Sequence, residues 1–151
     1  MSETLEQRLT HDSQEALKNH NARRREILGT ILAAVKKARI DAAGKTFGPV
    51  EELSVLEKAK KQREESVELY LKANRQDMVD REREEIEVIK SYLPAPLTES
   101  EVKQIVFDAV TQTGATTIKD MGKVMGIVQA QTKGRFDSAK VVNLVKAALG
   151  A

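Results

Sequence analysis

Apolar residues recur every three or four positions along most of this chain, which is the period of an amphipathic α-helix. The first 93 residues contain four such segments, at about residues 4–20, 27–42, 54–74 and 77–93. No segment shows the alternation of a strand. The pattern therefore predicts an N-terminal part of four helices. The last three are long enough to form an antiparallel bundle with the first laid against it.

The helical pattern breaks at residues 94–97 and then restarts. Pro94 and Pro96 cannot continue a helix. Three shorter apolar segments follow, ending near Gly114, near Gly134 and at the end of the sequence. The chain is therefore expected to be all-α, with an N-terminal helical domain at 1–93 and a C-terminal three-helix domain at 94–151.

Several helix starts carry capping signals. A Ser or Thr followed three residues later by an acidic residue predicts a capping box, and an apolar pair around it predicts a hydrophobic staple. The predicted boxes are Ser54 with Glu57, Thr98 with Glu101, and Thr117 with Asp120. The predicted staples are Leu97 with Val102, and Phe136 with Val141 around a capping Asp137.

Composition narrows the class of protein. The chain has no Cys, which excludes disulfides and thiolate chemistry, and 32% of its residues are charged. Residues 1–93 hold 18 basic and 18 acidic side chains, whereas residues 94–151 hold 7 and 5. Neither part has the charge of a strongly basic nucleic-acid-binding domain.

No segment has the pattern of a signal peptide or a membrane span, so we expect a cytoplasmic protein without a membrane partner.

A search for catalytic chemistry gives mainly negative results. Gly44-Lys45-Thr46 resembles the end of a phosphate-binding loop, but Arg39 stands where that loop needs a glycine. His11 and Glu15 lie one turn apart without a third candidate metal ligand nearby. We therefore expect no catalytic residues, no cofactor and no metal.

Two groups of basic residues are candidates for contact with phosphates. On the second helix, Arg25, Lys36 and Arg39 share one face, with Arg23 and Arg24 beside it. A solvated face paired with neighbouring acids is the favoured interpretation of this group, because residues 1–93 are neutral.

The second group surrounds two glycines one turn apart in a predicted helix, Gly122 and Gly126, with Lys119 and Lys123 beside them. Each glycine costs a helix about 1 kcal/mol relative to alanine, which calls for a compensating role. Close packing against another helix is favoured, close approach of a phosphate backbone is the alternative, and both can hold together.

Several blocks of the sequence resemble the GatB/YqeY family, and most closely its free-standing YqeY-like proteins. The blocks are Tyr92-Leu93-Pro94, Leu97–Glu101, Asp120–Gly126 and Lys133-Gly134-Arg135, together with Leu32–Lys36, Lys61–Ser66 and Asn74–Asp77 in the N-terminal part. The chain departs from the family pattern at Gly29, where an Arg is usual, and at Phe136, where an Ala is usual.

The resemblance implies a relationship to the tail of the B subunit of tRNA-dependent amidotransferases, which helps to hold tRNA. The family label is carbon–nitrogen ligase activity with glutamine as amido-N-donor, but the chain shows no catalytic centre to support it. The leading hypothesis is a non-catalytic accessory module that binds tRNA, with amidotransferase or aminoacyl-tRNA synthetase proteins as further partners. Its candidate residues are Lys119, Gly122, Lys123, Gly126, Lys133 and Arg135, with Arg23, Arg24, Arg25, Lys36 and Arg39 as a second patch. The alternatives are a protein–protein adaptor that does not bind RNA and a true amide-transfer enzyme.

Overall fold

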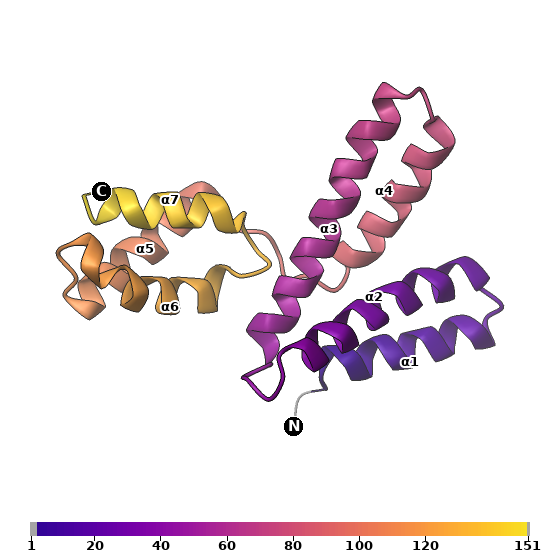
Figure 1. Cartoon of the computed structure of the whole chain (residues 1–151), viewed down its shortest axis with the longest axis horizontal. Coiled ribbons are helices and arrows are strands. Elements are labelled where there is room, and N and C mark those ends of the chain that lie inside the picture. Colours follow the sequence, from indigo (N-terminus) through magenta and orange to yellow (C-terminus); the bar gives the residue numbers. More distant parts are fainter. Residues whose placement is uncertain (1–2, 151) are drawn as a thin grey trace. The chain divides into compact units, whose positions relative to one another are not determined.

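The computed structural model describes residues 3–150 and is helical throughout that range, with no strand (Figure 1). The all-α prediction is confirmed. The helices are α1 (Leu5–Lys18), α2 (Ala22–Asp41), α3 (Pro49–Lys72), α4 (Gln76–Lys90), α5 (Glu99–Thr113), the short 3₁₀ helix η1 (Ile118–Asp120), α6 (Met121–Thr132) and α7 (Ser138–Ala148). Within residues 3–150, no helix is both long enough and apolar enough to cross a bilayer.

The chain divides into two compact units, Met1–Leu93 and Pro94–Ala151. In the first unit, α1 pairs with α2 and α3 pairs with α4, and the two hairpins meet where α2 packs against α3 and α4. The hairpins diverge toward their turns (Figure 1). The first helix forms a hairpin with the second, and its Leu5 and Leu9 join the core shared with α3 and α4. The short α1–α2 connection favours the hairpin, because short loops make consecutive helices antiparallel neighbours.

The core of this unit is aliphatic apart from one tyrosine. Side chains from all four helices and from the segment after α4 meet in it. They are Leu5, Leu9, Ile27, Leu28, Ile31, Val35, Leu56, Ala59, Ile89 and Tyr92.

Both hairpin turns are Schellman motifs built without glycine. At the end of α1, the N–H of Asn21 donates to the carbonyl of Ala16 (2.8 Å), and His20 has a φ of 56°. At the end of α3, the N–H of Arg75 donates to the carbonyl of Tyr70 (2.9 Å), and Asn74 has a φ of 57°. A left-handed residue at this position lets the last carbonyls of a helix find donors while the chain reverses.

The predicted start of α3 is wrong. The helix begins at Pro49, and the carboxylate of Glu51 accepts the N–H of Gly48 (2.8 Å). Proline fits the first helical position, where its missing N–H would have no partner inside the helix. Ser54 lies inside the helix, and its hydroxyl donates to the carbonyl of Val50 (3.2 Å).

In the second unit α5, α6 and α7 pack on one another around a valine-rich core. Two predicted caps are present: Thr98 Oγ1 accepts the N–H of Glu101 (3.2 Å), and Asp137 Oδ1 accepts that of Ala139 (2.8 Å). The predicted Thr117–Asp120 box is absent. Instead, η1 precedes α6, and the Asp120 carboxylate accepts the N–H of Thr116 (3.2 Å).

The residues of the predicted staples contribute to this core. Val102 and Val141 are buried in it, with Leu97 and Phe136 partly buried against it. The Phe136 departure from the family pattern thus places an aromatic ring beside the core.

Candidate nucleic-acid interface

The outer face of α6 is the candidate interface of the second unit. The helix buries Val124, Val128 and Thr132. Its period therefore turns a set of small and basic residues outward. The exposed members are Gly122, Lys123, Gly126 and Ala130, and Lys119 is exposed in the preceding turn.

The two glycines do not serve close helix packing. A Cβ built on Gly122 or on Gly126 would meet no atom of the described residues within 4 Å, apart from its chain neighbours and the helix's own backbone. The packing interpretation favoured from the sequence is therefore wrong. Each glycine still costs α6 about 1 kcal/mol relative to alanine. The result is a helix face without side chains at two positions, where the backbone is open to an approaching molecule.

The four basic candidates near this face divide into two pairs. Lys119 and Lys123 are exposed, and in residues 3–150 neither ammonium group has a hydrogen bond or an ion pair. Lys133 is half-buried, and its ammonium donates to Ser138 Oγ (3.0 Å). Lys119 and Lys123 are thus available to a ligand, whereas Lys133 lies in an internal contact.

Arg135 holds a loop of the second unit. Its guanidinium donates to the carbonyl of Ala95 (2.9 Å), and its own carbonyl accepts the N–H of Leu97 (2.8 Å). These bonds fix the segment before α5 to the turn between α6 and α7. Arg135 therefore has a structural role in this geometry.

Two members of the second patch, on α2, are paired with acids. Arg23 bonds to Glu85 (3.1 Å) and Glu84 (3.3 Å) of α4 and to Glu26 (3.4 Å). Partial desolvation opposes its charge, but the hydrogen bond and the charge of Glu85 prevail and raise the pKa of Arg23. Arg39 pairs with Glu6 of α1 (3.2 Å).

The other members of the patch differ from these two. Arg25 and Lys36 are exposed, and Arg24 is half-buried. Gly29, where the family usually has Arg, lies exposed between Arg25 and Lys36 with open space above its Cα. The structure therefore does not bring the five basic residues together as one free surface.

The residues tested for catalytic chemistry lie in ordinary structural positions. Gly44 has a φ of 86° in the turn after α2, and Glu15 pairs with Lys18 (3.3 Å) on α1. Within the described part of the chain, no three His, Cys, Asp or Glu side chains are grouped so that they could hold a metal ion.

The fold and this face define an all-helical protein of two units. One helix of the second unit, α6, exposes two glycines and a lysine. The sequence profile of the YqeY-like proteins matches residues 6–149. The chain belongs to the YqeY-like family.

Three curated relatives are fungal proteins named altered inheritance of mitochondria protein 41, mitochondrial. The Lachancea thermotolerans protein is 36% identical over 56% of this chain and 46% of its own length. The Vanderwaltozyma polyspora protein is 25% identical over 75% of this chain and 64% of its own length. The Pyrenophora tritici-repentis protein is 30% identical over 95% of this chain and 80% of its own length. The chain thus matches less than two thirds of the length of the first two.

These relatives contradict one expectation from the sequence. All three are named as mitochondrial proteins, which contradicts the expectation of a cytoplasmic protein. Absence of a sorting pattern within this sequence was the basis of that expectation, and it does not determine where members of the family act.

Proposed function

We propose that the chain is a non-catalytic module that binds tRNA through the outer face of α6. The observation that carries this proposal is the pair of exposed, unpartnered ammonium groups of Lys119 and Lys123 beside two glycines with open space above them. Cations that have no acid partner lose no internal bond when they contact phosphate. The missing side chains at Gly122 and Gly126 let a sugar–phosphate backbone approach the helix closely.

The kind of contact determines the kind of recognition. Contacts to phosphates position an RNA but do not read its bases, so tRNAs should be distinguished mainly by shape. By its resemblance to the amidotransferase B-subunit tail, the module would act beside amidotransferase or aminoacyl-tRNA synthetase proteins.

The test is a titration of labelled tRNA by fluorescence anisotropy over a series of salt concentrations. Each phosphate neutralised contributes about −0.7 to −0.9 to the slope of log K against log salt. The double variant K119A/K123A should therefore weaken binding to every tRNA and make the slope less steep by about 1.5. Lys146→Ala, which removes an exposed lysine of α7, is the control and should change binding little.

A second pair of variants tests the open backbone. Gly126→Leu should weaken binding, whereas Gly29→Leu, on an equally open position of α2, should not. Thermal melting of each variant separates lost binding from lost folding. Binding that is absent at low salt, or that does not depend on salt, would contradict the proposal and leave the adaptor hypothesis in its place.

A further inference from the structure

A polar pocket lies at the turn between α1 and α2, in the first unit. Its volume is about 120 Å³, and it is lined by Asp12, Glu15, Ala16, Asn19, Asn21 and Arg24. Since a cavity of about 10–15 Å³ on the same measure already holds one water molecule, the pocket has room for a small polar molecule.

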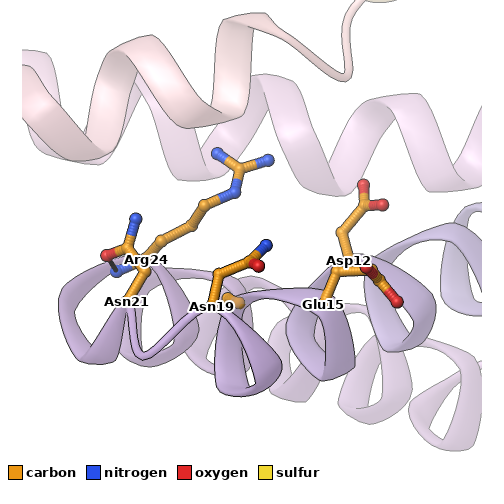
Figure 2. A pocket seen from close by; sticks show the side chains of 6 residues that line it. Asp12, Glu15, Asn19, Asn21 and Arg24 are labelled. Carbon is orange, nitrogen blue, oxygen red and sulfur yellow. Dashed lines mark hydrogen bonds between the residues drawn. The ribbon is translucent and has the colours of Figure 1, made fainter.

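The walls of the pocket carry opposite charges. Asp12 and Glu15 project from α1 on one side, and Arg24 projects from the first turn of α2 on the other (Figure 2). The side-chain amide of Asn19 lies between them (Figure 2). Although Arg24 lines the same pocket as the two carboxylates, it forms no ion pair with either within the described residues.

Arg24 is unusual among the arginines of the described chain. Four of them are half-buried: Arg23, Arg24, Arg63 and Arg135. Arg23 and Arg63 bond to Glu85, and Arg135 donates to the carbonyl of Ala95. In residues 3–150 the guanidinium of Arg24 is the one of the four without a hydrogen bond or an ion pair, although its charge acts on the nearby hydroxyl of Tyr92. A guanidinium has five N–H donors in a planar fork that suits a carboxylate, so an unpaired one on a pocket wall is available to an anionic group.

A hydrogen bond from Tyr92 holds Asp12 of the acidic wall in place. The buried hydroxyl of Tyr92 donates to Asp12, and the guanidinium of Arg8 lies over the tyrosine ring, 5.1 Å from its centroid. Burial, the hydrogen bond to Asp12 and the Asp12 charge all raise the pKa of Tyr92 well above its usual range. The phenol therefore stays protonated and remains a donor, and Asp12 keeps a second oxygen for another donor.

We propose that this pocket binds a small free α-amino acid in its zwitterionic form. Its carboxylate pairs with Arg24, and the Asn19 amide bonds between the two walls. Its ammonium group pairs with Asp12 and with Glu15, whose existing contact with Lys18 is a solvent-exposed pair that uses one carboxylate oxygen. The charges on the walls select this class of ligand. A simple anion would be repelled by the two carboxylates, a simple cation would leave Arg24 without a partner, and an apolar molecule would leave both charged walls without partners.

The experiment is an NMR titration of the full ¹⁵N-labelled chain with glycine and L-alanine at constant ionic strength. Saturable shifts are expected at the backbone amides of Asn19, Asn21 and Arg24. The pocket is open to solvent, so we expect dissociation constants on the order of 1 mM. Acetate and methylammonium, each carrying one of the two charges, should bind at least tenfold more weakly.

A pair of neighbouring variants completes the test. Arg24→Gln should weaken glycine binding about tenfold or more, because it removes a charge-assisted pair. Arg25→Gln, which changes the adjacent exposed arginine outside the pocket, should leave binding unchanged. A melting curve confirms that both variants fold.

Three outcomes would overturn the proposal. They are the absence of any shift with glycine up to about 100 mM, binding of acetate as tight as that of glycine, and equal effects of the two variants. None of them bears on the proposed tRNA site, which lies in the other unit.

Discussion

His20 and Asn74 reverse the chain at the two hairpin turns, and both take a backbone conformation that glycine adopts most easily. A non-glycine residue in the left-handed region costs about 1–2 kcal/mol. Asparagine and histidine are among the non-glycine residues found most often in this region, but both adopt it less readily than glycine. The sequence pattern gave no glycine signal at either turn. The helices could be predicted, but the motif that ends them could not.

Replacing His20 by glycine should therefore stabilise the first unit. We expect His20→Gly to raise the free energy of unfolding by about 0.5–1 kcal/mol, because glycine relieves the strain at a φ of 56°. His11→Gly is a matched control, since it makes the same change at an exposed position inside α1. It should lower the free energy of unfolding by about 0.3–0.5 kcal/mol, the difference between the helix propensities of glycine and histidine. Urea denaturation measures both, and a loss of stability in both variants would contradict the turn geometry.

At the scale of elements, the hairpins of the first unit are joined by an ionic network beside their apolar core. Glu85 of α4 bonds to Arg23 of α2 and to Arg63 of α3, and its side chain is only 16% exposed. The sequence pattern favoured a solvated face for the basic group that contains Arg23. Which basic residues are paired depends on contacts between residues far apart in the chain, and helical periodicity does not contain that information.

The network predicts different effects for two adjacent glutamates. Glu85→Ala should lower the free energy of unfolding by about 2–3 kcal/mol, because it removes the carboxylate that two half-buried guanidinium groups share. Glu84→Ala, at a side chain that is 52% exposed and pairs with Arg23 alone, should cost about 0.5 kcal/mol or less. Chemical denaturation of both variants checks the prediction. Similar losses would show that Glu85 is not the centre of the network.

Glu82, on the same helix, should make stability depend on pH. Desolvation, assisted by the charge of Glu85, raises its pKa in the folded protein. The folded state then holds the proton more tightly than the unfolded chain, so stability falls as pH rises through the ordinary glutamate pKa of about 4.3 toward the folded value. Glu82→Gln should therefore stabilise the protein at about pH 7 and lose this advantage below about pH 4. A gain of the same size at both pH values, measured by urea denaturation, would refute this assignment.

The local and the tertiary features of the second unit differ in how well they could be predicted. Thr98 and Asp137 were found as caps because a cap is decided by residues within one turn. Gly122 and Gly126 were correctly placed in a helix, but whether another helix covers them is a tertiary question. For the same reason, Lys123 and Arg135 look equivalent in the sequence, yet the first is free of internal partners and the second holds a loop.

At the scale of the whole molecule, the chain consists of two units with separate cores. The first core is built on α1 to α4 and the second on α5 to α7. The buried residues of each core lie entirely on one side of the Leu93–Pro94 junction. A separate core is the physical condition for a unit to fold by itself. The proline-containing break at 94–97 predicts this junction from the sequence alone. That the junction separates independently folding domains stays a prediction.

Two core substitutions test that prediction. Leu28→Ala removes a fully buried side chain of the first core and should cost about 2–5 kcal/mol, whereas Val145→Ala in the second should cost about 1.5–3 kcal/mol. If the units fold independently, each variant should shift the unfolding of its own unit and leave the other unchanged, since energetic effects at sites without shared partners are nearly independent.

Backbone amide hydrogen exchange under mild denaturant reports both units at once, because every helix carries its own probes. Faster exchange confined to α1–α4 in Leu28→Ala, and to α5–α7 in Val145→Ala, is the expected result. Loss of protection across both units in either variant would mean that the chain unfolds as one cooperative domain, in spite of its two cores.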